Sequence, residues 1–290
     1  MVNYMKNNKW IVLTIISLLS VVSCSSYFKK NTTVVDTEGQ VITLGSTGSD
    51  AQIWKYIAQS DEAKHLGLNI KVKEINDGVA LNRATLDKEI DVNAFQSWGY
   101  LKAFNQLNHN QLAAIATTYL EPMGLYSKKY NSLKSLPENA VVAIPNDAAN
   151  TARALRLLEQ SKLIKLSDHF NSITGNIENI TSNPKHLVIR LVEGSTVPRV
   201  LGDVDLAAIG NTVALDSGLN VLTQSLIHEN VSDNTAQNIN VLVVNRSRLN
   251  DETFKKLGVL YHQPFVEQYI QKNFAGTKVD VNQPVSQLPE

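Results

Sequence analysis

The sequence is poor in the residues that most metal and covalent sites need. Its 290 residues include one cysteine, Cys24, which excludes an internal disulfide and a cysteine-based zinc cluster. The histidines lie far apart in the chain and form no His-x-x-x-His pair: His65, His109, His169, His186, His228 and His262. We therefore expect no metal site and no cofactor.

Neither sign of charge is in excess. Lysine plus arginine number 27, as do aspartate plus glutamate, and no dense basic stripe with interleaved aromatic residues occurs. Nucleic acid is thus not an expected partner. A Gly-x-Ser-x-Gly elbow is absent, and no spacing of carboxylates singles out an acid and base pair. These absences favour a binding protein for a small molecule over an enzyme.

The N-terminus has the pattern of an export signal. Lys6 and Lys9 precede an apolar run, Trp10 to Leu19, which is short for a transmembrane span and ends in small residues before Cys24. This resembles the bacterial lipobox, in which the cysteine is lipidated; a buried structural thiol is the weaker alternative. We expect a signal peptide at 1–23 and a lipidated tether at 24–40. The rest would be anchored to a bacterial membrane, facing the periplasm or exterior.

Beyond residue 40, short apolar runs alternate with segments of helical period. The expected strands lie at 41–44, 69–75, 90–95, 112–118, 141–144, 186–192, 205–209 and 240–245. Helical patterns lie between many of them, and one or two helices are expected at 251–274. This order predicts an α/β architecture with mostly parallel sheets, which place ligands at the carboxyl ends of their strands.

The stretch 141–153 is the most informative of these units. Four apolar residues are stopped by Pro145 and Asn146-Asp147, and a helix follows from about Ala149. Arg153 would lie in or near its first turn, where a cation is unfavourable for the helix unless an anion is near. A carboxylate-binding site is one interpretation, because guanidinium matches a carboxylate. A surface arginine paired with a nearby Asp or Glu is the other.

Two more strand ends carry small polar residues, at 45–50 and at 210–212. The first lacks the endings of a P-loop and of a dinucleotide site, so Thr47 to Ser49 are interpreted as donors near a ligand, or Ser49 or Asp50 as a helix cap. An aromatic cluster follows another strand. Its members, which could form a ligand wall or simple core packing, are Phe95, Trp98 and Tyr100.

Several motifs together resemble the NlpA-type lipoproteins, the methionine-binding (MetQ-like) components of bacterial ABC importers. The resemblance covers about 41–276. It is carried by Asn93-Ala94-Phe95-Gln96, Tyr126-Ser127-Lys128-Lys129, Ile144-Pro145-Asn146-Asp147 with Asn150 and Arg153, Asn183-Pro184-Lys185, Pro198-Arg199 and Asp203-Val204-Asp205-Leu206-Ala207. It implies a bilobed periplasmic-binding fold, type II-like, that closes on an amino acid and delivers it to a permease and its ATPase.

The resemblance also implies roles for single residues. Arg153 would hold the substrate carboxylate beside Asn150, and Phe95 would form a wall of the side-chain pocket. The remaining predicted ligand-binding residues are Gln96, Ser97, Tyr119, Glu121 and Asn211, with Trp98 as a further apolar contact. Glu121 could pair with the ammonium group of the ligand or belong to a hinge ion pair. The predicted lobes are 41–120 with 240–290, and 121–239, joined by two crossing strands.

Three residues depart from the pattern of the family. Ser97 stands where methionine binders commonly have His, Trp98 where a smaller or polar residue is usual, and Gly210 where an Asn is expected. L-Methionine is thus the first expectation, with a related amino acid or a short methionine-containing peptide as alternatives. A surface lipoprotein acting as adhesin or sensor on the same fold is the competing hypothesis.

Overall fold

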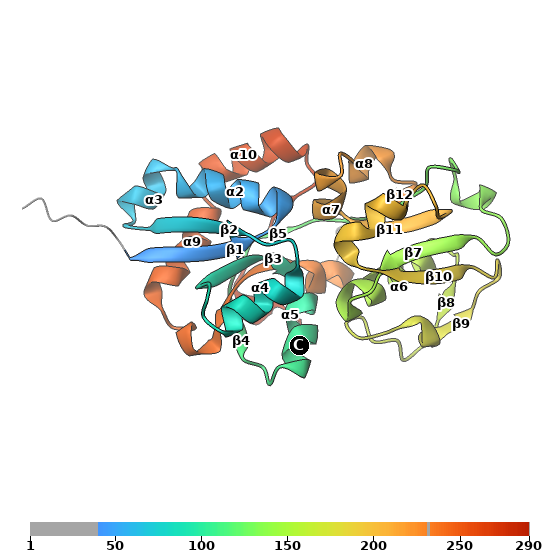
Figure 1. Ribbon diagram of the computed structural model, residues 1–290, viewed down its shortest axis with the longest axis horizontal. Coiled ribbons are helices and arrows are strands. Elements are labelled where there is room, and N and C mark those ends of the chain that lie inside the picture. Colours follow the sequence, from blue (N-terminus) through green and yellow to red (C-terminus); the bar gives the residue numbers. More distant parts are fainter. Residues whose placement is uncertain (1–39, 231–232, 290) are drawn as a thin grey trace, which may run out of the picture. The chain divides into compact units, whose positions relative to one another are not determined.

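The computed structural model describes residues 40–230 and 233–289. The predicted signal peptide, Cys24 and nearly all of the tether lie outside the described residues. The described chain contains two five-stranded sheets, one blue to teal with an orange strand and one green to gold (Figure 1). Within the described ranges no helix is both long and apolar enough to cross a bilayer.

The first sheet has the strand order β2-β1-β3-β13-β4. Its strands are β1 (Val41–Ser46), β2 (Asn69–Glu74), β3 (Val92–Ser97), β4 (Leu112–Thr117) and β13 (Asn240–Asn245). β1 pairs in parallel with β2 and β3, whereas β13 is antiparallel to both of its neighbours. Four strands therefore run in one direction, and the reversed strand is the one that returns from the far part of the chain.

The second sheet repeats this arrangement in the order β10-β7-β11-β6-β12. Its strands are β6 (Met123–Tyr126), β7 (Val141–Pro145), β10 (Val188–Val192), β11 (Leu206–Gly210) and β12 (Ile227–His228). β7 is parallel to β10 and β11, and β6 is antiparallel to β11 and β12. The prediction of mostly parallel sheets is confirmed, with one reversed strand in each.

Helices cover both sheets. Those around the first sheet are α2 (Gly48–Ala58), α3 (Asp61–His65), α4 (Gly78–Leu86), α5 (Trp98–Leu107), α9 (Glu252–Tyr261) and α10 (Pro264–Phe274); those around the second are α6 (Ala148–Gln160), α7 (Asn211–Asp216) and α8 (Val221–Gln224). We call these two groups, with their sheets, the first and second lobe. Short 3-10 turns lie at Leu133–Ser135, Ile177–Asn179, Gly194–Val200, Asp233–Asn238, Arg246–Arg248 and Val285–Gln287.

Alternation along the strands buries both faces of each sheet. In β13, Leu242 and Val244 pack with α2, α9 and α10, whereas Val241 and Val243 pack on the other face with α5. A strand covered on both faces has a continuous apolar run, and β13 has one at Val241 to Val244, although it is the antiparallel strand of the sheet. The same pattern in β7, β11 and α6 builds the core of the second lobe.

Two segments of the chain join the sheets, and the strand β14 pairs with the first of these segments. The chain passes from β4 to β6 through β5 (Tyr119–Leu120) and returns from β12 to β13. β14 (Val279–Asp280) pairs antiparallel with β5. The strands of the first sheet come from 41–117 and 240–245 and those of the second from 123–228; the lobe boundaries at 120 and 240 stay a prediction.

Two segments contain little regular structure. Residues 132–136 form only a 3-10 turn, and the stretch 164–179 contains β8 (Lys165–Leu166), paired with β9 (Ile180–Ser182), and loops. In the aromatic cluster, Phe95 lies in β3, whereas Trp98 and Tyr100 lie in the first turn of α5, where the Ser97 hydroxyl accepts the Tyr100 N–H and caps the helix.

Candidate functional site

Arg153 lies on α6, directly after the carboxyl end of β7. Asp147 caps this helix by accepting the Asn150 N–H at 2.9 Å, and the helix begins at Ala148. Arg153 is therefore the sixth helical residue, one turn further in than the first turn. Its side chain is only 9% exposed. The guanidinium thus points inward, which excludes the interpretation of a surface arginine.

A carboxylate of the chain itself engages Arg153. Nε donates to Glu229 Oε1 and Oε2 at 2.9 and 3.0 Å, and Nη2 donates to Glu229 Oε2 at 2.5 Å. Nη2 also donates to the Glu121 carbonyl at 2.7 Å. Nη1 makes no hydrogen bond to any residue that the structure describes. The predicted pairing of Arg153 with an acid is present, but it is buried, and Nη1 is the donor left over.

The ion pair keeps Arg153 charged despite its burial. Burial disfavours the charged form, but the adjacent Glu229 more than offsets this and holds the pKa of Arg153 above its ordinary value. Glu229 is itself fixed, since its Oε2 also accepts the Met123 N–H at 2.8 Å. The orientation of the guanidinium is thus set by the strand β6 and by the segment after β12.

Glu121 links Arg153 to the first residues of α7. Its Oε2 accepts from Asn211 Nδ2 at 2.9 Å and from Lys278 Nζ at 2.7 Å, while Oε1 accepts from Thr212 Oγ1 at 3.0 Å. Burial raises the pKa of Glu121, but Lys278 and Asn211 outweigh it, so that the pKa is lowered overall. The side chain is thus in an ion pair beside β5, as the second of its two predicted roles required.

Asn211 contributes an unusual acceptor. The residue is fully buried, and its Nδ2 is used by Glu121 and by Thr277 Oγ1 at 3.1 Å. Its Oδ1 is buried without a hydrogen bond to any described residue. A buried acceptor without a hydrogen bond is energetically unfavourable. Asn211 Oδ1 is therefore a candidate to accept a hydrogen bond from a ligand.

Tyr119 contacts the ion pairs that Lys278 makes with Asp50 and Glu121, which we call the ion-pair cluster. Its hydroxyl donates to Asp50 Oδ1 at 2.6 Å, and Lys278 Nζ lies 4.1 Å from the centroid of its ring. Burial and the nearby carboxylates raise the pKa of Tyr119 well above its ordinary value. In this structure Tyr119 therefore contacts the charged side chains of Asp50 and Lys278.

Phe95 lies near the end of β3, close to α4 and two residues before the N-cap of α5. Its ring meets Tyr100 edge-on at 5.7 Å between centroids, and a Cβ on Gly78 would stand 2.7 Å from Phe95 Cε2. Burial, followed by Asp147 and Asp77, raises the pKa of Tyr100. Since Asp147 caps α6 beside Asn150, Phe95 and Tyr100 lie where α5 of the first lobe contacts α6 of the second.

Gln96 is 2% exposed and has its amide fully used within the first lobe. Its Nε2 donates to Asn82 Oδ1 and Asn93 Oδ1 at 2.6 and 2.7 Å, and its Oε1 accepts from Asn82 Nδ2 at 3.0 Å. Asn93 also donates to Thr85 Oγ1 at 2.7 Å. This buried network fixes α4 against β3, and it gives Gln96 a structural role that the prediction of a ligand contact did not include.

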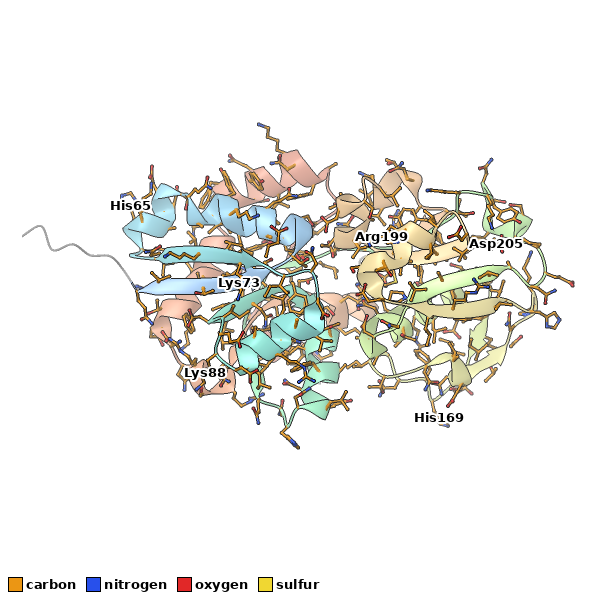
Figure 2. All side chains as sticks on the ribbon, viewed as in Figure 1. His65, Lys73, Lys88, His169, Arg199 and Asp205 are labelled. Atoms are coloured by element: carbon orange, nitrogen blue, oxygen red, sulfur yellow. The ribbon has the colours of Figure 1, made fainter. Side chains whose placement is uncertain are left out.

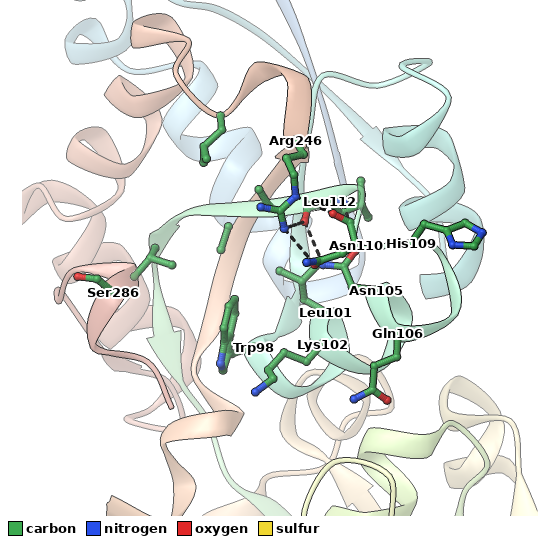
Figure 3. Close-up of a pocket in the computed structure, with 14 residues that line it drawn as sticks. Trp98, Leu101, Lys102, Asn105, Gln106, His109, Asn110, Leu112, Arg246 and Ser286 are labelled. Atoms are coloured by element: carbon green, nitrogen blue, oxygen red, sulfur yellow. Dashed lines mark hydrogen bonds between the residues drawn. The ribbon is translucent and has the colours of Figure 1, made fainter. Parts of the chain in front are cut away.

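Trp98 faces a different pocket from the one expected. A groove of about 860 Å³ lies on the first lobe along α5 and β4, and Trp98 lines it beside Leu101 and Lys102 (Figure 3). The indole N–H donates to the Pro289 carbonyl at 2.7 Å. The role of Trp98 beside the ligand side chain stays a prediction.

The loop after β1 holds a carboxylate of the second lobe. Thr47 is the N-cap of α2 but makes no side-chain capping bond, and the Ser49 N–H donates to Asp216 Oδ1 at 3.0 Å. Gly48 has φ +49°, and a Cβ there would lie 1.8 Å from Asp216 Oδ2. The interpretation of Ser49 or Asp50 as the cap is wrong, and Asp216 takes the place where a ligand was expected.

The described histidines form no cluster that could bind a metal ion. His65 and His169 belong to different lobes and lie at the periphery (Figure 2). In the two described ranges, no group of three or more His, Cys, Asp or Glu side chains is arranged to hold a metal ion.

Comparisons with known proteins agree with this geometry. The family model described as NlpA lipoprotein matches residues 42–282. The chain belongs to the NlpA lipoprotein family. Similar relatives include the uncharacterized lipoprotein YhcJ of Bacillus subtilis, with 30% identity over 97% of both chains. Another is the probable D-methionine-binding lipoprotein MetQ of Pasteurella multocida, 33% identical over 81% of this chain and 84% of the relative.

A solved structure extends the similarity to the fold. A nutrient-binding protein of Burkholderia cenocepacia, solved bound to methionine, superposes with a TM-score of 0.78. It is 34% identical, and the match covers 82% of this chain and 99% of that one. The fold predicted for this NlpA-family chain, a two-lobed binding-protein fold, is confirmed.

Sequence reasoning missed two residues of this NlpA-family site, Glu229 and Lys278. Both lie far from their partners in the chain: 76 residues separate Glu229 from Arg153, and 157 separate Lys278 from Glu121. One signal was available for Lys278, because a lysine beside the small residues Gly276 and Thr277 follows a closing amphipathic helix and is not part of a surface pattern. Glu229 carried no such signal.

Proposed function

We propose that this NlpA-family lipoprotein is the substrate-binding component of an ABC importer. It captures an amino acid, L-methionine before others, between its two lobes and delivers it to a permease and its ATPase. It acts by binding and is not an enzyme. The methionine-bound neighbour and the relatives named MetQ support the ligand class.

The observation that carries the proposal is a pair of unused polar groups on either side of Glu121. Arg153 Nη2 bonds to the Glu121 carbonyl, and Asn211 Nδ2 bonds to its carboxylate. Asn211 Oδ1 is thus a buried acceptor without a partner among the described residues, and the hydrogen bonds of Arg153 to described residues use Nε and Nη2 and leave Nη1 as a charged donor. The first suits the carboxylate of an amino acid, and the second suits its ammonium group.

Ligand entry would require the lobes to separate. Arg153 and Asn211 are 9% and 0% exposed, so an amino acid could not reach them from solvent in this form. It would therefore enter a more open form and select the closed one, by rotation about the segments that contain β5 and the return to β13. The importer would recognise the closed form.

The other predicted residues keep proposed roles at this junction. Phe95 would form the apolar wall, with Asn150 near the carboxylate and Ser97 at the cap of α5. Gln96 and Tyr119 would support the site indirectly. Gln96 would do so through the buried amide network with Asn82 and Asn93, and Tyr119 through its contacts with Asp50 and Lys278. Cys24 would carry the lipid that anchors the chain in the cell envelope, facing the periplasm or the exterior.

Calorimetric titration with L-methionine and then the other amino acids tests this function. The protein is refolded first to remove any carried-over ligand. We expect saturable binding of L-methionine, weakened at least about tenfold by Arg153→Met, since a hydrogen bond to a charged group contributes about 1.5–3 kcal/mol. Arg156→Met, on the exposed side of the same helix, is the matched control and should bind as wild type. Wild-type affinity in Arg153→Met would remove the assignment.

One observation favours a second candidate, a surface adhesin or sensor. The groove along α5 and β4 has a volume of about 860 Å³, and seven of its lining residues are apolar: Trp98, Leu101, Leu112, Ala113, Ala114, Leu249 and Val285. Failure to bind any amino acid in the titration would favour this function over the importer.

A further inference from the structure

A buried ammonium group connects four segments of the chain. Lys278 Nζ donates to Asp50 Oδ1 at 2.9 Å, to Glu121 Oε2 at 2.7 Å and to Thr212 Oγ1 at 2.9 Å. The Lys278 side chain is 0% exposed, and those of Asp50 and Glu121 are 3% and 10% exposed. All three charges are thus removed from water, where their mutual geometry matters most.

These contacts tie the two lobes together at their junction. Asp50 lies in the first turn of α2 in the first lobe, and Thr212 lies in the first turn of α7 in the second. Glu121 follows β5, and Lys278 immediately precedes β14. The bond from Ser49 N–H to Asp216 adds a second contact between α2 and α7. A change at Lys278 would therefore reach both lobes.

The cluster has more negative than positive charge. Asp50 and Glu121 share the one ammonium group of Lys278. Asp50 Oδ1 accepts from both Lys278 and Tyr119, but Asp50 Oδ2 is buried with no hydrogen bond to any described residue. A buried carboxylate oxygen without a donor is unfavourable. A proton on Oδ2 would remove the excess charge without displacing the two donors on Oδ1.

We propose that Asp50 is the proton-binding member of an interlobe tie, and that Lys278 is the positioning residue that transmits its state. With Asp50 ionised, Lys278 is shared between α2 and Glu121. With Asp50 protonated, Lys278 pairs with Glu121 alone, and α2 loses its ion pair to the segment before β14. The tie involves no ligand, so it stands independently of the proposed function.

Titration of Asp50 lies in an accessible range. Burial is the largest influence and raises the pKa of Asp50 to about 6, with Lys278 opposing and Glu121 reinforcing the rise. Lys278 has a raised pKa, since Asp50 and Glu121 outweigh its burial, so it stays charged there. Glu121, with its lowered pKa, stays ionised.

The other titratable groups that face Asp50 are two phenols and a carboxylate. Burial, followed by the charge of Asp50, raises the pKa values of Tyr119 and Tyr261 well above the ordinary value, so neither titrates near pH 6. Asp216, on α7, also has a pKa raised by burial, which Ser49 and Lys278 oppose. Asp216→Asn is therefore needed to separate the two carboxylates.

The sign of the effect follows from linkage. Because the pKa of Asp50 is raised in the folded protein, the folded state binds the proton between about pH 6 and pH 4, where the unfolded chain does not. Ionisation of Asp50 therefore opposes folding above pH 6, and this opposition disappears as the pH falls to about 4. A pKa near 6 corresponds to about a tenfold change in the unfolding equilibrium constant between pH 7 and pH 5.

Thermal unfolding of the full-length chain in detergent, at pH values from 5 to 8, tests the proposal. Asp50→Asn should remove the tenfold change attributed to Asp50, whereas Asp216→Asn and the exposed control Glu62→Gln should retain it. Parallel pH profiles for wild type and Asp50→Asn would overturn the proposal. If Asp50→Asn does not fold, a carbon-13 titration of the wild-type carboxyl decides, with a midpoint near 6 supporting the proposal and one near 4 refuting it.

Amide hydrogen exchange tests transmission by Lys278. After correction for the intrinsic rate, wild type should gain protection at the start of α2 and in the segment around Lys278 between pH 7.5 and pH 5.5, because the proton on Asp50 removes the excess buried charge. Asp50→Asn should show the higher protection at both pH values. Equal protection of wild type at both pH values would refute the tie, whatever the ligand of the protein is.

Discussion

The buried pair Arg153 and Glu229 gives the sharpest test of the site. Glu229→Gln keeps the shape of the side chain and one amide oxygen for the Met123 N–H, but it removes the negative charge. Arg153 is then a charged group, only 9% exposed, with no carboxylate bound to its guanidinium. Nη2 keeps the Glu121 carbonyl, a neutral acceptor.

The expected magnitude follows from the contact geometry. Unit charges about 4 Å apart attract by about 4 kcal/mol at an effective dielectric constant of about 20. Removing one partner of a buried pair is measured to cost about 3–5 kcal/mol, because the other charge stays buried without compensation. Since glutamine retains a hydrogen bond, we expect the lower end, about 3 kcal/mol. For a chain of this size that lowers the Tm by roughly 6–12 °C.

Thermal unfolding at pH 7 measures the effect. The matched control is Glu159→Gln on the same helix, where the partner Arg156 is 39% exposed and the expected loss is below about 1 kcal/mol. Arg153→Met combined with Glu229→Gln should recover most of the lost stability, because no buried charge remains. A decrease for Glu229→Gln no larger than that for Glu159→Gln, or no recovery in the double variant, would refute the reasoning.

Two further predictions concern residues that hold the lobes and the first sheet in place. Gly48→Ala should destabilise the protein by more than about 2 kcal/mol, since a Cβ at φ +49° would clash with the Asp216 side chain. In the control Gly67→Ala, at φ +69°, the Cβ would meet no atom within 4 Å, and the cost should be only about 1 kcal/mol. Equal decreases in Tm for the two variants would contradict this prediction. Asn93→Ala removes three buried hydrogen bonds, those to Asn82, Thr85 and Gln96, so urea unfolding should show a loss of about 2–3 kcal/mol, and a loss below about 1 kcal/mol would count against the network.

Local pattern predicted the elements well where it also determines their packing. The apolar run at 240–245 is β13 to the residue, and β7 extends one residue beyond its prediction, to Pro145. Burial on both faces requires such continuous runs, so the sequence records them directly. The short strands β8 and β9 were not predicted, because they are stabilised by each other and not by a repeating apolar face.

The polar residues at the strand ends predicted where the two lobes meet, but not which groups bind there. Small polar residues follow β1, β7 and β11, and all three ends lie at contacts between the lobes. Chemistry alone could not assign what fills them. At β1 the occupant is Asp216, and at β7 the guanidinium of Arg153 is already paired with Glu229. A ligand and an internal carboxylate have the same charge, so residue type at a strand end does not distinguish them.

Charge balance at the junction explains why a zwitterion suits it. Two buried cations, Arg153 and Lys278, face three carboxylates, those of Asp50, Glu121 and Glu229, so the described cluster already has one excess negative charge. An anion alone would add to this excess, and a cation alone would find the Glu121 and Glu229 carboxylates already bonded to internal donors. An amino acid adds no net charge and needs one donor and one acceptor. Arg153 Nη1 and Asn211 Oδ1 supply these two groups, which makes the ligand class a consequence of what the internal pairs leave unused.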